Sequence, residues 1–518
     1  MFEKLFEACR RIDEAQTPPS EPPEDLLQLI PDGVTTKDVN QFLLTSIKEL
    51  NSITALWAAY AGVLKISKNV KGEQDGSGHD ADTLTEIADR ISSMTLPLCT
   101  GASLDNDTTD YAALRRKGEL GLRVLDQLTE IPQNEPLQLR PSTLLRVTAF
   151  SDIADPWTTA ASSELAGSIL SPLDEQPQKQ TQLIADEILI GFLRPLFSKS
   201  RPAAVTASGR KAEYVEQSRY DAVARDSPET KPWKYVHRYA VTVFAWAVRR
   251  ADAPLLQKHW HLFTPVLLTL LDEQHSTPLK IRALCILRAF WSRCPAGLMR
   301  DTGLADVFEQ AVFPSVLFLP SLTPEDESLQ ILGAAYPVLI EMAGLDCATL
   351  TDTDATTSAS VAEKQPQDIT EGQRKLLDKI IREGVMVGYH HAKEHVRLDF
   401  IPMVSDILTD PFGTKHPPTL YSAAKLLQAV LRNCWPRIPH YGNEVVKMLM
   451  LCWLNIEDEE SFPSTGPSAD DLKAELTKTA DMLAAVMKAA KEDLSERVNP
   501  LIEKEPHLSQ LFRTNNSS

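Results

Sequence analysis

The stretch between Pro232 and Gly344 constrains the fold of this chain more than any other part of the sequence. Within Trp233–Arg250 the apolar side chains recur every three or four positions and form one continuous stripe, which is typical of an amphipathic helix. The same spacing predicts four further helices, joined by short turns that contain proline: His259–Glu273, Pro278–Arg293, Gly303–Leu319 and Pro324–Gly344. An apolar stripe is stable in water only when it packs on a neighbour, so we expect these helices to stack.

Similar helical patterns occur on both sides of this stretch. No convincing run of β-branched residues shows the period of two that is typical of a strand. Further helices are expected at Phe2–Ala15, Lys37–Ser67 (one helix or a helix pair), Thr83–Leu98, Asp110–Ile131, Arg140–Ala154, Pro156–Leu170, Gln178–Phe197 and Asp470–Phe512. The sequence therefore predicts an all-α chain.

Three short motifs recur where we expect a helix to begin: Phe263-x-Pro265, Phe313-Pro314 and Phe400-x-Pro402. Each expected helix is followed by a turn and a second amphipathic helix. The first two motifs are spaced close to the HEAT or armadillo period of about 40–47 residues, and an insertion with an extra helix at Gln373–Tyr389 lengthens the next interval. We therefore predict a HEAT/armadillo-like α-solenoid of stacked antiparallel helix pairs with disordered insertions.

Polar stretches suggest where this array divides. We expect an amino-terminal helical array at 1–197, a flexible insertion at 198–231 with the main boundary, a HEAT-like core at 232–455 with an insertion at 345–368, an acidic loop at 456–468, and carboxy-terminal capping helices and tail at 469–518. The last segment carries a narrow apolar seam close to heptad spacing. It is predicted to cap the array, and docking into a groove of another chain is the alternative.

The chain is acidic, with 53 Lys and Arg residues against 71 Asp and Glu residues and a net charge of −18. Phosphate backbones and anionic lipid surfaces repel such a chain, so direct binding to nucleic acid or membranes is disfavoured. The seven cysteines are scattered without a C-x-x-C pair, and no apolar run is long enough for a signal peptide or a membrane-spanning helix. These features predict reduced thiols and a cytoplasmic and nuclear location. Cys285 lies beside an apolar stripe and is expected to be buried and inert.

One cluster resembles a metal site. His391 and His395 are spaced to share one face of a helix. The metalloprotease pattern, however, needs a glutamate directly after the first histidine, where Ala392 stands, and no third ligand is identifiable. No nucleophile elbow, phosphate-binding loop or kinase motif is present. We therefore predict no catalytic, cofactor or metal site, and a metal-dependent hydrolase is the alternative.

Four tryptophans concentrate in the central region: Trp233, Trp246, Trp260 and Trp291. Large aromatic side chains dominate both cores and interfaces, so we treat these residues, together with Lys280, as candidate partner contacts, and expect some of the tryptophans to pack between helices instead. Asp272 and Arg282 have the spacing of a charged ladder that bridges stacked repeats. The alternative is that both charges are simply solvated.

Several blocks in this region carry a family resemblance: Pro232–His237, Leu262–Asp272, Thr302–Leu304 and Leu319–Glu325. In this order they are similar to the Tel-two-interacting protein two family, the smaller Tti subunit of the Triple-T (TTT) co-chaperone complex. Glu273 departs from the pattern, because a second aspartate is expected at that position. The amino-terminal half of the chain matches only in its helical character.

The resemblance implies a non-catalytic scaffold subunit. Its partners would be the larger Tti subunit and the Tel-two subunit, and indirectly the phosphatidylinositol-3-kinase-related kinases and the heat-shock-protein-ninety chaperone with its R-two-T-P adaptor. It implies no cofactor and no direct contact with nucleic acid or membrane. From the residues alone, a HEAT-repeat adaptor of another assembly, in transport or trafficking, remains an alternative.

Overall fold

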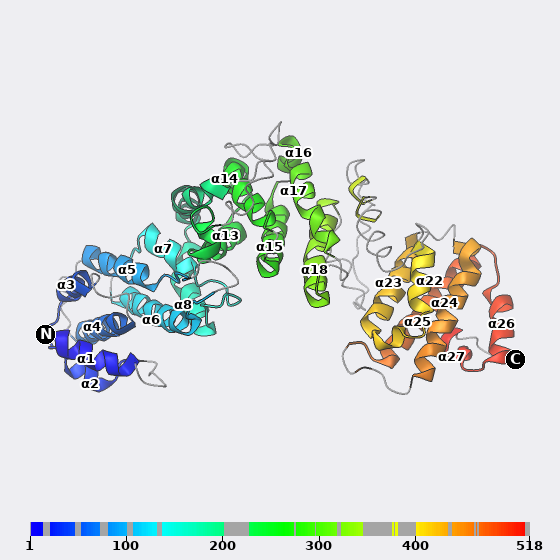
Figure 1. Ribbon diagram of the computed structural model, residues 1–518, viewed down its shortest axis with the longest axis horizontal. Coiled ribbons are helices and arrows are strands. Elements are labelled where there is room, and N and C mark those ends of the chain that lie inside the picture. Colours follow the sequence, from blue (N-terminus) through cyan, green and yellow to red (C-terminus); the bar gives the residue numbers. More distant parts are fainter. Residues whose placement is uncertain are drawn as a thin grey trace. The chain divides into compact units, whose positions relative to one another are not determined.

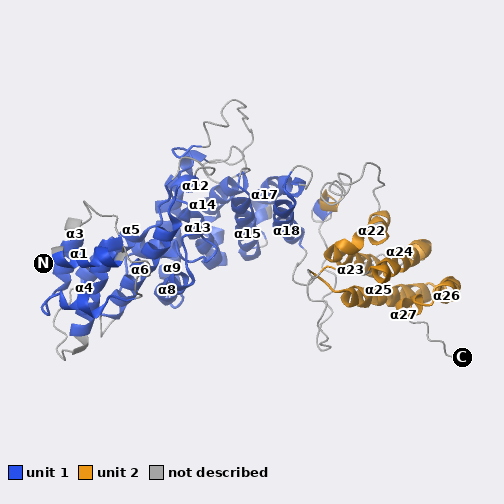
Figure 2. Cartoon of the chain, turned by 60° about the horizontal axis from the view of Figure 1, so that its bottom comes forward, with its two compact units in different colours: residues 1–378 blue, residues 379–518 orange. Residues whose placement is uncertain are grey.

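The structure is a computed structural model that describes residues 2–13, 21–46, 53–72, 81–100, 107–131, 137–200, 227–273, 276–295, 297–318, 323–344, 375–377, 379–381, 400–433, 438–459, 463 and 466–512. Every regular element in these ranges is a helix, so the chain is all-α as predicted. It forms two compact units, residues 1–378 and 379–518 (Figure 2), and each is described here by itself. The expected insertion at 345–368, most of the insertion at 198–231, His391 and His395 lie outside the described residues.

The first part of unit 1 is built from two rows of helices (Figure 1). Its helices are α1 (Phe2–Asp13), α2 (Glu24–Gln28), α3 (Thr36–Ser46), α4 (Ile53–Gly72), α5 (Ala81–Thr95), α6 (Tyr111–Glu130), α7 (Pro141–Thr148) and α8 (Ala160–Leu170). In one row α3 packs on α5 and α5 on α7, and in the other α4 packs on α6 and α6 on α8. Within each row a helix therefore buries its apolar stripe against the helix two places along the chain, whereas α1 packs on α4.

Two glycines on α6 allow its neighbours to come close. A Cβ atom at Gly121 would lie 2.7 Å from Cγ2 of Thr95 on α5, and one at Gly118 would lie 2.5 Å from Cε1 of Phe150. Real Cβ atoms essentially never approach other atoms so closely, so this packing requires residues without a side chain.

The second part of unit 1 continues the same arrangement. Its elements are η1 (Ser171–Leu173), α9 (Pro177–Gln182), η2 (Leu183–Leu193), α10 (Arg194–Phe197), η3 (Ser198–Ser200), α12 (Pro232–Tyr235), α13 (Tyr239–Arg250), α14 (Ala253–Leu271), α15 (Thr277–Arg293), α16 (Leu298–Asp301), α17 (Leu304–Val312), η4 (Phe313–Leu317) and α18 (Glu325–Met342). Helix α15 packs between α13 and α18, and α14 packs between α10 and α17.

A chain of buried phenylalanines runs through this second part. Phe244 of α13 contacts Phe263 of α14, Phe263 contacts Phe290 of α15, and Phe290 contacts Phe308 of α17. The ring centroids are 5.9–6.1 Å apart, within the range of favourable aromatic pairs. These four side chains are buried and join four helices into one core.

Most expected helices are present, but several expected details are wrong. Trp233–Arg250 is broken into α12 and α13. Helix α14 begins at Ala253, earlier than predicted, because the Asp252 carboxylate accepts a hydrogen bond from the Leu255 amide and caps it at 2.9 Å. Phe263 and Pro265 therefore lie inside α14 and do not open it, and Phe313-Pro314 begins the 3₁₀ turn η4.

The expected main boundary at 198–231 does not separate two domains. Helix α10, before this segment, packs on α12 and α14 after it, and the ring of Phe197 stacks on Trp233 with the centroids 4.9 Å apart. The two compact units divide between Asp378 and Lys379 instead.

Unit 2 contains α22 (Phe400–Leu408), η6 (Gly413–Lys415), α23 (Pro417–Asn433), α24 (Ile438–Asp458), α25 (Ala469–Ala489), α26 (Leu494–Lys504) and α27 (Leu508–Phe512). The expected acidic loop at 456–468 begins later than predicted, because α24 continues to Asp458. The apolar seam of α25 is buried within this unit against α23 and α24 through Leu472, Leu476, Ala480, Leu483 and Met487. This seam is therefore part of the core of unit 2.

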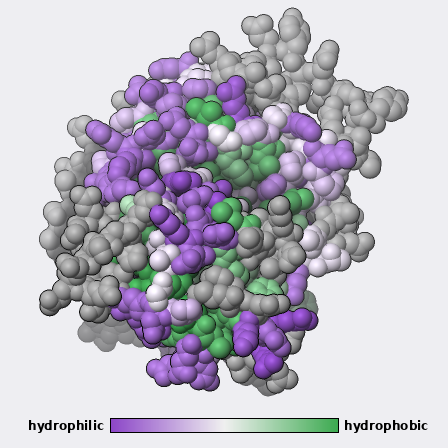
Figure 3. Space-filling view, turned by 90° about the vertical axis from the view of Figure 1, so that its left-hand side faces the viewer, coloured by the Kyte–Doolittle hydropathy of each residue, from purple (hydrophilic) through white to green (hydrophobic). Residues whose placement is uncertain are grey.

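Within the described ranges, no helix combines the length and apolar character needed to cross a membrane. Figure 3 shows the side of the molecule that lies at the left of Figure 1, where hydrophobic residues are visible in several places among hydrophilic ones. Singly exposed apolar side chains are normal on a protein surface, so this face by itself does not identify a binding site.

Candidate partner-binding site

Arg282 forms a polar cluster that joins three separate parts of unit 1. It donates from Nη1 to one carboxylate oxygen of Asp155 and from Nη2 to the other, the latter at 3.2 Å. Nη2 also donates to Asp152 at 3.1 Å, and the hydroxyl of Thr242 on α13 donates to Asp155 at 2.6 Å. Burial opposes the charge of Arg282, but its hydrogen bonds to Asp155 and Asp152 and the negative charges of these carboxylates outweigh burial and raise the pKa of the guanidinium. This cluster fixes the segment after α7 to α13 and α15.

Glu273 forms a second buried cluster just after α14. Its carboxylate accepts a hydrogen bond from Lys231 at 2.9 Å and one from Lys234 at 3.0 Å. The side chains of Glu273 and Lys234 are 1% and 2% exposed. Burial raises the pKa of Glu273, but the two lysines outweigh it and hold the pKa below its ordinary value of 4.5. The departure from the expected aspartate therefore has a structural role, because the longer side chain reaches both ammonium groups.

The expected ladder between Asp272 and Arg282 is not formed. Asp272 is exposed, whereas Arg282 is turned toward Asp152 and Asp155. Bridges between neighbouring helices do occur at other residues: Arg146 of α7 pairs with Asp89 of α5 at 2.7 Å, and Arg288 of α15 pairs with Glu341 of α18 at 2.6 Å.

Two of the candidate tryptophans belong to the core. Trp233 is fully buried, and its indole N–H donates to the Ser200 hydroxyl at 2.9 Å. Trp246 is 5% exposed and lies against the guanidinium of Arg250. Neither side chain can contact a partner while the chain stays folded. The prediction of partner contact therefore remains only for Trp260 and Trp291, which are both partly exposed.

Lys280 is also a core residue and not an accessible partner contact. It is 4% exposed, and its ammonium group donates to the main-chain carbonyl of Leu271, the last residue of α14. Burial lowers the pKa of Lys280, although Asp272 and Glu273 act in the opposite direction. Its role is to satisfy a carbonyl that has no partner within the helix.

Cys285 is exposed on α15, so the prediction of a buried thiol is wrong. Its neighbours Leu284 and Ile286 are buried, and Cys285 lies on the outer side of the helix.

Among the described residues, no group of histidine, cysteine, aspartate or glutamate side chains could hold a metal ion.

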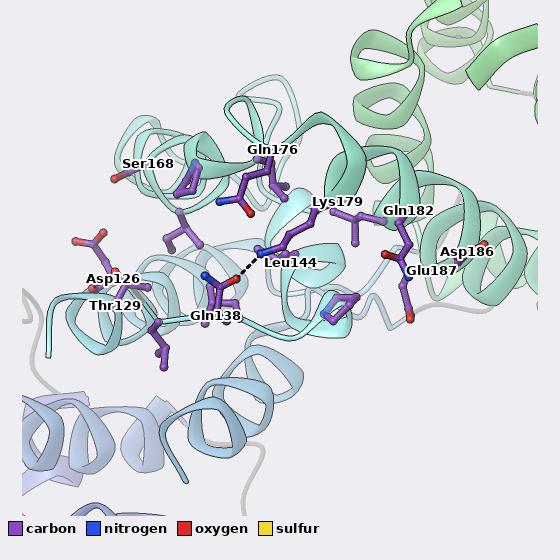
Figure 4. Close-up of a pocket in the computed structure, with 17 residues that line it drawn as sticks. Asp126, Thr129, Gln138, Leu144, Ser168, Gln176, Lys179, Gln182, Asp186 and Glu187 are labelled. Carbon is purple, nitrogen blue, oxygen red and sulfur yellow. Dashed lines mark hydrogen bonds between the residues drawn. The ribbon is translucent and has the colours of Figure 1, made fainter. Parts of the chain in front are cut away.

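A groove of about 380 Å³ lies on unit 1 between α6, α7, α8 and α9 and the start of η2. Its apolar side chains are Leu137, Leu139, Leu144, Ile169, Leu173 and Leu183. Figure 4 shows Lys179 reaching across to Gln138, where its ammonium group donates to the amide oxygen at 2.7 Å. The volume is in the usual range of binding pockets. Its lining of leucine and isoleucine side chains makes this groove a candidate binding site for apolar groups.

One wall of the groove is the start of η2, which is a π-helix over Leu183–Leu193. Pro195 lies two residues after the end of η2, has no N–H to donate to the carbonyl of Gly191, and would crowd that carbonyl in an α-helix. The wider π turn relieves this crowding, and the Arg194 amide donates to the Leu189 carbonyl, five residues back. π-Helical turns are rare and often mark functional sites.

A sequence model of the Tti2 family matches residues 143–399 of the chain. This chain belongs to the Tti2 family. No curated protein and no solved structure matches it. The Tti2 match begins in α7 and therefore includes part of the groove, the Arg282 cluster and the Glu273 cluster. It also begins well before residue 232, where the sequence predicted the start of the Tti core.

Sequence reasoning missed the groove and the residues that hold the Tti2 region together. Asp155 and Thr242 carry no motif, because their partner Arg282 is far away along the chain. A usable signal was present for η2, since Gly191 and Pro195 interrupt an otherwise strongly apolar helix. The groove itself has no linear signature, because six different elements supply its walls.

Proposed function

We propose that this chain is the non-catalytic scaffold subunit of the TTT co-chaperone complex. In this role it binds the larger Tti subunit and the Tel-two subunit. With the heat-shock-protein-ninety system and its R-two-T-P adaptor, the complex supports the maturation and stability of phosphatidylinositol-3-kinase-related kinases. The single observation that carries the proposal is the Tti2 family match over residues 143–399.

The helix packing of unit 1 supports a scaffold role. Helices two places apart along the chain pack in rows, and we propose that these rows are a HEAT-type α-solenoid. Such arrays present long surfaces to which each repeat contributes a strip. A partner that binds only the folded form of a client stabilises that client by mass action, without any chemical step. We propose the cytoplasm and the nucleus as the locations in which this occurs.

Affinity purification of the tagged full-length chain from cells, followed by quantitative mass spectrometry, tests the proposal. We expect the larger Tti subunit and the Tel-two subunit in amounts close to that of the tagged chain. Depletion of the chain is expected to lower the steady-state levels of the kinases, and re-expression should restore them. Recovery of the chain alone would contradict the proposal. Recovery with other stoichiometric partners would favour a HEAT-type adaptor in transport or trafficking.

A further inference from the structure

We propose that the groove beside η2 binds a segment of a partner protein in which aliphatic side chains stand next to lysine or arginine. The inference rests on the proposed function, because it takes the segment to belong to one of the two sister subunits. It goes further by stating where the segment binds and what chemistry it carries.

The floor of the groove supplies the aliphatic part of this recognition. Leu137, Leu139 and Leu144 are only partly buried, although they face the same hollow as Ile169 and Leu183. Aliphatic side chains placed in this hollow would remove the exposed parts of the three leucines from water. Burial of apolar area stabilises a complex by about 25 cal/mol per Å² before the costs of association.

His259 lies near enough to Asp186 to interact with it, but the rim of the groove is otherwise acidic. Asp126, Asp186 and Glu187 line it, and within the described part of the chain none of these carboxylates forms an ion pair with a lysine or arginine. The one cationic side chain in the lining, Lys179, has its ammonium group on Gln138. A basic side chain from outside would therefore meet carboxylates with which no lysine or arginine of this part of the chain pairs.

Asp126 shows the cost of leaving this charge unbalanced. Burial raises the pKa of its carboxyl above 3.8, and the nearby Glu130 raises it further. A lysine or arginine placed beside Asp126 would favour the charged carboxylate and lower that pKa. The carboxylates that line the rim and the raised pKa of Asp126 therefore both favour a segment that carries lysine or arginine.

The sign of the charge excludes the other large classes of ligand. Nucleic acid and anionic lipid headgroups are repelled by the carboxylates of the rim. Beyond the groove on the same π-helix, Ile190 is 42% exposed. It extends the apolar surface roughly one helical turn past Asp186, so a segment longer than the groove would still find an apolar contact.

Fluorescence anisotropy with the full-length chain and overlapping peptides that cover both sister subunits tests the inference. We expect binding by at least one peptide that contains aliphatic residues next to lysine or arginine. The double variant Asp186→Asn, Glu187→Gln should weaken its binding about tenfold, and added salt should weaken wild-type binding. The matched control Glu444→Gln, Glu503→Gln removes the same charge from exposed positions in unit 2 and should change nothing.

A second pair of variants tests the apolar floor. Leu137→Ser, Leu139→Ser should also weaken peptide binding about tenfold, whereas Leu98→Ser, at an exposed leucine outside the groove, should not. The inference is overturned if no peptide binds, if the bound peptide is acidic, or if the groove variants bind as well as the controls. If the sister subunits still co-purify with the full-length chain in those cases, the proposed function stands and only the groove is excluded. Failure of co-purification contradicts the proposed function itself.

Discussion

Arg282 on α15 donates to both carboxylate oxygens of Asp155, which lies 127 residues earlier in the chain. Asp155 follows α7, whose residues line the groove, and the Thr242 hydroxyl on α13 completes its hydrogen bonds. The first and second parts of unit 1 are therefore joined by a polar cluster around the buried Asp155 as well as by apolar packing. A cluster of this kind fixes a relative orientation, since its hydrogen bonds are satisfied in one arrangement only.

The variant Arg282→Met should destabilise unit 1 by about 3–5 kcal/mol, because it leaves the Asp155 carboxylate buried without a cation. Urea unfolding followed by circular dichroism measures this loss. The control Arg293→Met removes an exposed arginine near the end of the same helix and is expected to change the free energy of unfolding by less than about 0.5 kcal/mol. Equal stability of both variants would show that the cluster contributes little.

Stability at low pH should depend on Glu273. Its pKa in the folded chain lies below the ordinary value of 4.5, so its contribution is fully present above pH 4.5 and is lost as the pH falls through the lower folded value. The variant Glu273→Gln should be less stable than the wild type by roughly 3 kcal/mol at pH 7. This difference should shrink as the pH falls below 4.5, in urea unfolding at a series of pH values. A difference that stays constant down to strong acid would contradict the role of Lys231 and Lys234.

Two glycine variants should have opposite effects. Gly121→Ala places a Cβ atom against Thr95 and should destabilise the fold by about 1–3 kcal/mol through overpacking. Gly167→Ala, on α8, meets nothing within 4 Å and should stabilise the helix by about 0.5–1 kcal/mol. Thermal unfolding of the two variants gives the comparison directly. If Gly167→Ala lowered the melting temperature, helix propensity would not be the main contribution of this position to stability.

The tryptophans should separate into structural and interface residues. Trp233→Ala is expected to cost about 3–5 kcal/mol of stability, because the indole is fully buried, and Trp246→Ala should also destabilise the fold. Trp260→Ala and Trp291→Ala should leave the helical circular-dichroism signal and the melting temperature nearly unchanged and reduce the yield of co-purified partners. If partner yield is unchanged in both, these partly exposed side chains are not interface residues.

Thiol labelling should distinguish Cys285 from the buried cysteines. Cys285 is exposed, whereas burial raises the pKa of Cys9, Cys294 and Cys452 to about 12 each. A short exposure of the native protein to iodoacetamide at pH 8 should modify Cys285 first, because the thiolate is the reactive form. Peptide mass spectrometry assigns the sites, and urea-unfolded protein is the control in which all should react. Labelling of Cys452 at the rate of Cys285 would contradict its burial.

The helices could be predicted from the sequence because their cause is local. The apolar stripe of Pro278–Arg293 predicts α15 to within one residue, since periodicity depends only on positions a few residues apart. The predicted helix ends were less accurate where a capping side chain outside the apolar stripe sets the first residue of the helix, as Asp252 does for α14. Because α14 begins at Ala253, Phe263 and Pro265 lie inside it. The sequence pattern predicted the start of a helix at this proline, whereas α14 continues through it.

The site could not be predicted because its residues meet only in three dimensions. Arg282 was expected to pair with Asp272 because the two have the spacing of a charged ladder between repeats, and instead it pairs with Asp152 and Asp155. Lys280 and Trp233 were taken as surface residues by type, but long and amphipathic side chains bury their apolar parts readily when a polar partner is available. Leu271 supplies a main-chain carbonyl to Lys280, and Ser200 supplies a hydroxyl to Trp233 from across the stretch 201–226; no sequence motif marks either contact.

The hydrogen bond between Trp233 and Ser200 has a consequence for how the chain can vary. This bond holds Ser200, just before the stretch 201–226, against α12. After that stretch, the hydrogen bond from Lys231 to Glu273 holds the chain next to the end of α14. Because both ends are held together by the folded helices, each doubling of the intervening length costs only about 0.6 kcal/mol of closure entropy. Relatives can therefore differ widely in length at this point while keeping the same helices, and an epitope or reporter protein inserted there should leave the neighbouring helices intact.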